Sequence, residues 1–239
     1  MKKNTLKTGD NIKTSKSGWK FSGKTALNFD NHIKKSVPLY NWSHDLTLKL
    51  SDFFLNEKTH IYDLGCSTGT FLKELSSRSN KNHVYYGIDE IKDMCKIAKK
   101  NNKKNKNVKI INEKIESVKF KKSSLITSFY TMQFINASKR QSIFNKIYHN
   151  LNWGGAFVLF EKVRAPDARF QDITTQVYNE FKIENGFTAD EIISKSMSLK
   201  GVMDPFSSKA NIDMLKRAGF KDVTSVLKFL NFEGFLAIK

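Results

Sequence analysis

The chain has 239 residues, enough for one domain with a full hydrophobic core and no disulfide or metal staples. Its two cysteines, Cys66 and Cys95, belong to no CxxC pair or Cys/His cluster, so we expect no metal site and a reducing, cytoplasmic setting. The N-terminus is polar and lysine-rich, and no later stretch approaches the roughly 18 to 20 apolar residues of a membrane span. We therefore expect no membrane partner.

The formal net charge of +18 suggests nucleic acid or another polyanion as a partner. The positive charge comes mostly from lysine, however, and its densest run is Lys99–Lys109. Arginine, which alone makes bidentate contacts to phosphate and guanine, occurs only at Arg78, Arg140, Arg164, Arg169 and Arg217. A solvated lysine-rich surface is thus favoured over a nucleic-acid interface.

The composition and hydrophobic patterns along the sequence predict one domain with an N-terminal tail and one insertion. Residues 1–17 are polar and show no hydrophobic periodicity, so we expect a flexible basic tail. Residues 18–239 show no repeat or low-complexity linker, which indicates a single domain. Within it, residues 165–209 contain two amphipathic stretches and are interpreted as a helical insertion.

Strand and helix patterns alternate through the rest of the chain. Short runs rich in β-branched and aromatic residues lie at 60–65, 83–89, 107–111, 124–130 and 155–161, with helical patterns between them. This alternation predicts βαβ units and a parallel sheet covered on both faces. Two further runs, 222–230 and 232–239, are too close to be anything but an antiparallel hairpin. We predict an α/β, Rossmann-like fold with a seven-stranded, mostly parallel sheet.

A ligand-binding turn follows the first of these strands. The strand stops at Asp63, and the chain turns through Gly65 and Gly69 into a helix whose free N–H groups suit an anionic group. Asp89 ends the next strand, at the interval expected for a carboxylate that accepts hydrogen bonds from ribose hydroxyls. Ser67 replaces the second glycine of a dinucleotide fingerprint, which favours a nucleoside without phosphates such as S-adenosylmethionine.

Several strings in the sequence resemble a known family. The "DLGCSTG" turn, the acidic residue after the second strand, "LNWGG" and "AGF" are similar to class I S-adenosylmethionine-dependent methyltransferases. More specifically, "FDNHIKKSVPLY" (29–40), "YDLGCSTG" (62–69) and "FKIENGFTADEIISKSM" (181–197) resemble the carboxy-S-adenosyl-L-methionine synthase family of the tRNA wobble-uridine pathway. The resemblance extends from about residue 19 to 239. It implies transfer of the carboxyl group of prephenate onto the methyl group of S-adenosylmethionine.

The resemblance and the turn together indicate which residues bind the cofactor. Tyr40 matches a ligand-contacting tyrosine, the turn matches the part that touches the amino-acid portion, and the residues after the second strand match the ribose-binding pair. Cys66 is interpreted as a packing residue, because no activating base for a nucleophile can be identified. The expected cofactor-binding residues are Tyr40, Asp63, Gly65, Cys66, Ser67, Gly69, Asp89, Glu90, Glu113 and Phe129.

Three positions depart from the resembled family. In that family an arginine holds the new carboxylate by a bidentate pair and directly follows the lysine that matches Lys195, where this chain has Ser196. Lys200, one helical turn away, is a candidate substitute. Lys114 stands where the family has an acidic residue, leaving Glu113 as the nearest carboxylate, and Phe129 stands where the family has an asparagine.

These departures shift the predicted activity toward the use of ordinary S-adenosylmethionine. We expect a methyltransferase acting on a small molecule, with His32 as the candidate base, Arg164 as a group that binds an acidic acceptor, and Glu161 as a further catalytic candidate. Carboxy-S-adenosylmethionine synthesis from prephenate is the first alternative. A non-catalytic nucleic-acid-binding protein is the second. The insertion also predicts a homodimer, since the resemblance gives it a part in the dimer interface.

Overall fold

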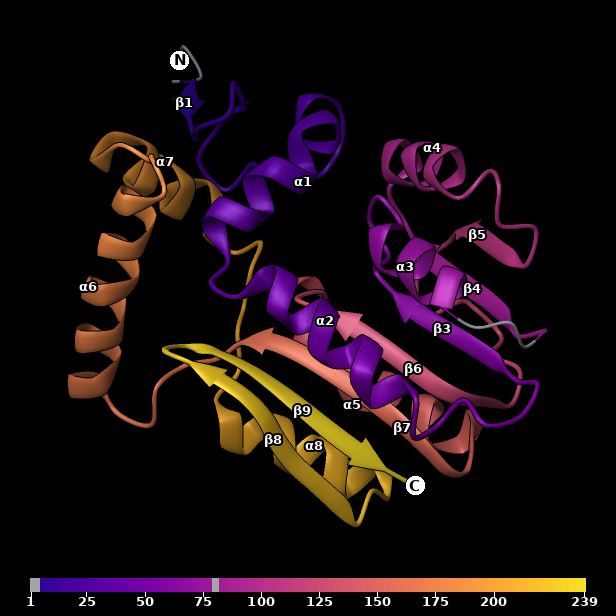
Figure 1. The fold of residues 1–239 in the computed structure, drawn as a ribbon. Coiled ribbons are helices and arrows are strands. Elements are labelled where there is room, and N and C mark those ends of the chain that lie inside the picture. The colour runs from indigo at the N-terminus through magenta and orange to yellow at the C-terminus, as the bar shows by residue number, and fades with distance from the viewer. Residues whose placement is uncertain (1–4, 79–81) are drawn as a thin grey trace.

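A computed structural model describes residues 5–78 and 82–239 of the chain. Within these residues the main sheet has seven strands in the order β5-β4-β3-β6-β7-β9-β8 (Figure 1). The first five of these run parallel, and β9 runs antiparallel to both of its neighbours. The strands are β3 (His60–Leu64), β4 (Val84–Asp89), β5 (Val108–Asn112), β6 (Ser123–Phe129), β7 (Leu151–Lys162), β8 (Asp222–Phe229) and β9 (Phe232–Ile238). The predicted fold class is confirmed.

The central strand β3 shows why these short apolar runs become strands. It pairs with β4 on one side and β6 on the other, and Ile61, Tyr62 and Leu64 are almost completely buried. A strand covered on both faces has no polar side, so its sequence is a continuous apolar run. Strand β7 begins earlier than predicted, because Leu151 already pairs with Ser123 before a register shift.

Helices cover both faces of the sheet and give two hydrophobic cores. One core joins the sheet to α2 (Tyr40–Ser51) and α3 (Thr70–Arg78). The other joins it to α5 (Ala137–Asn150) and α8 (Ser208–Ala218). Helix α4 (Lys92–Asn101) packs beside α3, and a short 3-10 turn, η1 (Met132–Phe134), follows β6. The carboxyl ends of the parallel strands are left for a ligand.

The N-terminal segment differs from the expected flexible tail. Strands β1 (Leu6–Lys7) and β2 (Lys13–Thr14) form a small antiparallel pair, and Thr8 and Ile12 are buried. The amides of Ser17 and Trp19 donate to carbonyls of the insertion, at 3.0 and 3.2 Å. These tertiary contacts order the segment although its sequence shows no hydrophobic periodicity. Residues 1–4 of the predicted tail lie outside the described residues. Helix α1 (Lys24–Ser36) follows.

The insertion forms two helices beside the sheet. Helix α6 (Ala168–Glu184) stands apart at one side of the molecule, and α7 (Ala189–Leu199) lies across its end, next to β1 (Figure 1). The side chain of Asp167 caps α6, and Thr188 and Glu191 form a reciprocal capping box at the start of α7. Helix α7 of the insertion contacts β1 of the N-terminal segment, so these two parts of the chain lie side by side.

Candidate functional site

A cavity of about 660 Å³ opens where the parallel strands end. Its walls come from the turn after β3, the end of β4, the loop after β6, and the helices α1, α2, α6 and α7. Cavities of this size hold a cofactor-sized ligand and lie at this edge in doubly wound sheets. The N-terminal segment and the insertion therefore close a site that the sheet begins.

The turn after β3 has the backbone shape expected from its glycines. Gly65 has a φ of 76°, and a Cβ built on it would lie 2.2 Å from Thr131 Oγ1, so no side chain fits there. The amides of Gly65 and Cys66 both donate to the carbonyl of Ile88. Gly69 has a positive φ as well, but it packs against Ala98 of α4 and does not line the cavity. Its expected contact with the ligand is therefore corrected to a packing role.

Asp89 connects the turn to the end of β4. Its Oδ2 accepts the N–H of Ser67 at 3.0 Å, and its Oδ1 accepts the N–H of Ile91 at 2.8 Å. Burial raises the pKa of its carboxyl, against the effect of these two bonds. Each oxygen keeps a further lone pair, and Asp89 and the exposed Glu90 both line the cavity. This arrangement fits the hydroxyl pair of a ribose.

Two buried residues, one in β3 and one in the turn, also line the cavity. Asp63 accepts a hydrogen bond from Thr127 Oγ1 at 2.9 Å, and burial raises its pKa to about 7. Burial also raises the pKa of the Cys66 thiol well above its ordinary value. A protonated, buried thiol is a poor nucleophile, which agrees with the packing role expected for Cys66.

Aromatic side chains form one wall of the cavity. Tyr40 begins α2, and its ring centroid lies 4.6 Å from that of His44. Phe129 lies at the end of β6, 4.6 Å from the His44 ring and stacked on Phe160 at 5.4 Å. Tyr40 and Phe129 both line the cavity, and their contact with the cofactor stays a prediction. Where the resembled family has an asparagine, this chain therefore offers an apolar surface.

Two of the carboxylates chosen from the sequence do not reach the cavity. Glu161 is buried beneath the loop after β6, and its Oε1 accepts the N–H of Met132 at 3.0 Å, so its role is to hold that loop. Glu113 directly follows β5, is exposed and is not among the lining residues, while Lys114 and Glu116 line the cavity. Both expectations are corrected. For Glu161 the reason is the pleat of β7, in which the neighbouring Lys162 faces the cavity and Glu161 faces the other side of the sheet.

Arg164 and His32 line the cavity but are already engaged. Arg164 Nε donates to the carbonyl of Pro205 at 2.9 Å, and its guanidinium lies 3.5 Å from Asp204. His32 Nδ1 lies 2.8 Å from Asp10 Oδ2. Its Nε2 contacts the ammonium group of Lys195. His32 is therefore bonded on both ring nitrogens rather than free to act as a base on a substrate.

Lysines gather at the end of the cavity formed by β7 and the insertion. Lys162 ends β7, Lys182 lies on α6, and Lys195 lies on α7; we call these three the lysine cluster. Burial lowers the pKa of Lys162 and Lys182 to about 8 and that of Lys195 to about 7, and mutual repulsion adds to the shift for Lys162 and Lys195. In the described part of the chain, no carboxylate forms an ion pair with any of them.

The lysine cluster was missed in the sequence, and so was Asp10. Their positions are far apart in the chain and follow no spacing rule; Lys195 and His32 are separated by 163 positions. Ser196 and Lys200, the two positions weighed from the sequence, also line the cavity, but both side chains are exposed. The cavity thus has an acidic end at Asp63 and Asp89 and a basic end at the lysine cluster.

Neither a metal site nor a membrane-spanning helix is found among the described residues. No group of three or more His, Cys, Asp or Glu side chains is arranged to hold a metal ion in residues 5–78 and 82–239. No helix of that part of the chain is both long and apolar enough to cross a membrane.

Comparison with known proteins gives consistent matches. Residues 61–155 match the family described as "Methyltransferase domain". A carboxy-S-adenosyl-L-methionine synthase of Staphylococcus epidermidis is 42% identical over 92% of this chain and 97% of its own length. The Campylobacter lari protein of the same name is 35% identical over 92% of this chain and 94% of its own length.

Solved structures agree on the fold. A putative S-adenosyl-L-methionine-dependent methyltransferase of Methanococcus maripaludis superposes with a TM-score of 0.62 at 19% identity, covering 95% of this chain and 97% of that one. Magnesium protoporphyrin IX methyltransferase of Synechocystis gives a TM-score of 0.65 at 10% identity, covering 92% and 96%. At these identities the likeness concerns the fold alone.

Proposed function

The chain belongs to the carboxy-S-adenosyl-L-methionine synthase family, and from this premise we propose that it makes carboxy-S-adenosylmethionine from S-adenosylmethionine and prephenate. Membership makes it an S-adenosylmethionine-dependent transferase. The proposal replaces the sequence-based preference for methyl transfer by its first alternative.

The lysine cluster carries this proposal. Three ammonium groups without carboxylate partners among the described residues are costly at the edge of a cavity, unless the ligand is itself anionic. Prephenate has two carboxylates and suits such a site. The argument for methyl transfer was that Ser196 leaves a carboxylate without a counter-charge. Lys162, Lys182 and Lys195 supply that charge from other positions.

The two ends of the cavity suit different reactants, S-adenosylmethionine at the acidic end and prephenate at the basic end. Asp89 suits the ribose of the nucleoside and the turn at Gly65 suits the amino-acid portion, while Tyr40 and Phe129 add aromatic wall that keeps water from the reactants. Bound S-adenosylmethionine supplies the methyl carbon that receives the carboxyl group. The lysine cluster binds and orients the carboxylates of the second substrate, which places the two reactants side by side.

We further propose a cytoplasmic homodimer as the working form. The support is the outward face of α6, where Phe170, Ile173 and Val177 expose 51%, 48% and 40% of their surface. Apolar side chains at these spacings on a helix that buries no residue in the monomer suit a second copy of the chain.

The first test is mass spectrometry of the nucleoside that co-purifies with the protein and of the product formed from S-adenosylmethionine and prephenate. We expect carboxy-S-adenosylmethionine in both samples. S-adenosylhomocysteine accumulating with a methylated acceptor, together with no carboxylated product from prephenate, would contradict the proposal and restore the methyltransferase interpretation.

A further inference from the structure

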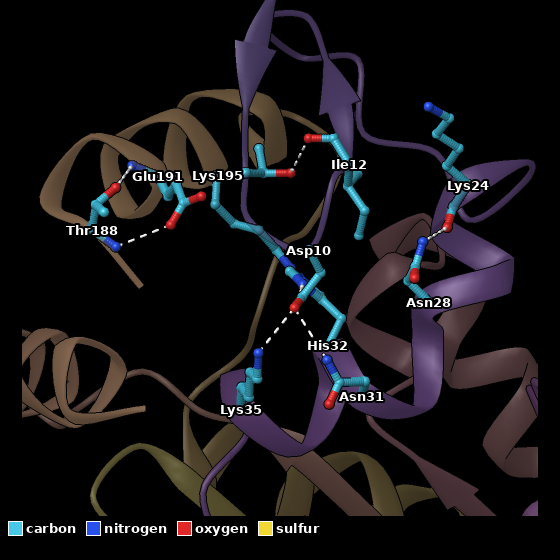
Figure 2. A network of polar contacts seen from close by, with 11 residues as sticks. Asp10, Ile12, Lys24, Asn28, Asn31, His32, Lys35, Thr188, Glu191 and Lys195 are labelled. Atoms are coloured by element: carbon cyan, nitrogen blue, oxygen red, sulfur yellow. Dashed lines mark hydrogen bonds and ion pairs between the residues drawn. The ribbon is translucent and has the colours of Figure 1, made fainter. Parts of the chain in front are cut away.

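A chain of polar contacts runs from the N-terminal segment to the basic end of the cavity (Figure 2). Asp10, in the turn between β1 and β2, contacts Nδ1 of His32 on α1, and Nε2 of His32 contacts the ammonium group of Lys195 on α7. Asp10 Oδ1 also accepts hydrogen bonds from Asn31 at 3.1 Å and Lys35 at 3.0 Å. Three elements distant in sequence therefore meet at one lysine.

The protonation states along this chain follow from burial. The pKa of His32 is lowered to about 4 by burial and by the charge of Lys195, so its imidazole is neutral at neutral pH. A neutral imidazole has one N–H and one acceptor nitrogen. With Nδ1–H donated to the Asp10 carboxylate, Nε2 must be the acceptor. It can then receive a proton of the Lys195 ammonium and fix its direction.

Trp19 is a further residue in contact with the ammonium group of Lys195. The ammonium lies 3.9 Å from the centroid of the Trp19 ring, which itself stacks on His32 at 5.7 Å. A cation over an aromatic face is stabilised without its charge being neutralised. Within residues 5–78 and 82–239, Lys195 Nζ donates a hydrogen bond only to His32 Nε2, so further N–H donors of the ammonium group are left for a ligand.

We propose that Lys195, held in place by His32 and Asp10, is the cation that binds the carboxylate of carboxy-S-adenosylmethionine, in place of the arginine that Ser196 replaces. Lys195 is then a binding residue, while His32 and Asp10 are positioning residues. The inference rests on the proposed function and deepens it. It also gives the N-terminal segment a part in the site.

Charged groups face Lys195 from every element around it. Lys182 of α6 and Lys162 of β7 repel its ammonium, and Asp10 of the β1–β2 turn stabilises it. On α1, His32 is neutral and Lys35 is paired with Asp10. On α7 itself, Glu191 is engaged in the capping box. Asp10 is thus the carboxylate whose charge raises the pKa of Lys195, against the lowering by burial and by the two other lysines.

The direct test replaces Lys195 and measures two ligands separately. In Lys195→Met we expect the affinity for carboxy-S-adenosylmethionine to fall at least about tenfold, as for the loss of one charge-assisted hydrogen bond, while the affinity for S-adenosylmethionine stays within about twofold. Isothermal titration gives both constants. Lys99→Met, an exposed lysine on α4, is the matched control. Equal losses for both ligands would mean that Lys195→Met has a folding defect. The pH profile of Asp10→Asn, described below, then tests the role of Lys195.

A second variant restores the charge at the family position. Ser196 is exposed and lines the cavity, so Ser196→Arg can be added to Lys195→Met without displacing core atoms. We expect the double variant to regain the affinity for carboxy-S-adenosylmethionine. Lys200→Met tests the rival position, which directly follows the same helix. A loss in Lys200→Met with none in Lys195→Met would overturn the proposal.

The positioning role is tested by the pH profile of carboxy-S-adenosylmethionine formation. Lys195 binds a carboxylate only when protonated, so its contribution is present below its pKa and lost as the pH rises through it. Removing the negative charge in Asp10→Asn lowers that pKa, and the alkaline fall in kcat/KM moves to lower pH. His32→Phe keeps the ring but removes the acceptor, and we expect KM for prephenate to rise about 3- to 10-fold.

The two proposals fail in different ways. A wild-type protein that forms no carboxy-S-adenosylmethionine from prephenate contradicts the proposed function, and the inference falls with it. A wild-type protein that forms the product, with Lys195→Met and Asp10→Asn behaving like it, contradicts the inference alone.

Discussion

Asp89 shows how one side chain can both shape a site and bind in it. Its two oxygens accept the N–H groups of Ser67 and Ile91, which fixes the turn after β3 relative to the start of α4. The remaining lone pairs are free for ligand hydroxyls. The carboxylate is therefore needed in its charged, acceptor-only form.

Asp89→Asn is expected to weaken S-adenosylmethionine binding about 10- to 100-fold, the equivalent of the ~1.5–3 kcal/mol typical of a hydrogen bond to a charged group. The amide N–H₂ would also face a backbone N–H donor. Titration calorimetry measures the change. Glu113→Gln, an exposed carboxylate outside the cavity, is the control, and we expect it to bind as the wild type does. A large effect at Glu113 would restore its place in the site.

At this scale the sequence could predict the acidic end of the cavity and not the basic end. Asp63, Gly65 and Asp89 follow one another at spacings that a βαβ unit dictates. Asp10, His32 and Lys195 obey no such rule, because they meet only when the N-terminal segment and the insertion fold against each other. The lone hint was His32, chosen as a base; the structure makes it a link between two charged groups.

Among the elements, α2 packs over the sheet with a histidine in its buried face. His44 is almost completely buried, and its ring lies 5.4 Å from Phe71 and 4.6 Å from Phe129. Burial lowers the pKa of His44 to about 4. The unfolded chain, with an ordinary pKa near 6.5, binds a proton there that the folded chain does not.

The contact of α2 with the sheet should therefore weaken in acid. As pH falls from about 6.5 to about 4, His44 lowers the free energy of unfolding by ~1.4 kcal/mol per pH unit. Above pH 6.5 its contribution is constant. His44→Phe keeps the ring contacts and removes the titration, so urea unfolding at pH 7 and pH 5 should show a smaller loss in the variant. An equal loss would mean that His44 is not the titrating group.

The elements that the sequence predicted well are those with internal patterns. The runs at 60–65 and 83–89 correspond to β3 and β4 within one residue at each end. Buried strands consist largely of apolar residues, which makes them recognisable in the sequence. The short pair β1–β2 has no such signal and was expected to be a tail. The pair packs against α7, and the residues that follow it, Ser17 and Trp19, donate backbone hydrogen bonds to Met197 and Ser198 of that helix. Backbone bonds of this kind depend on no particular side chain, so the sequence does not reveal them.

For the whole molecule, α6 presents two faces to different surroundings. Tyr178 and Lys182 line the cavity, while Ile173 and Val177 are exposed on another side. If the exposed side is the homodimer interface, Ile173→Glu should produce a monomer near 27.5 kDa at micromolar concentration in sedimentation velocity, where the wild type is a dimer. Asn179→Glu adds the same charge on a different side of α6 and should leave the dimer intact. A monomeric wild type would contradict the proposed assembly.

The opposite charges at the two ends of the cavity have a consequence for the direction in which ligands are accepted. An internal field points from the lysine cluster toward Asp63 and Asp89, and walls of low polarity let it act over the length of the cavity. A ligand that entered reversed would set anion against carboxylate and hydroxyl donor against ammonium, so misorientation is penalised at both ends at once. The net charge of +18 extends the same preference into solvent, since it attracts dianions at a distance and does so less as salt is added. The protein thus favours anionic metabolites over cationic ones before they reach the cavity, through the sign of their charge.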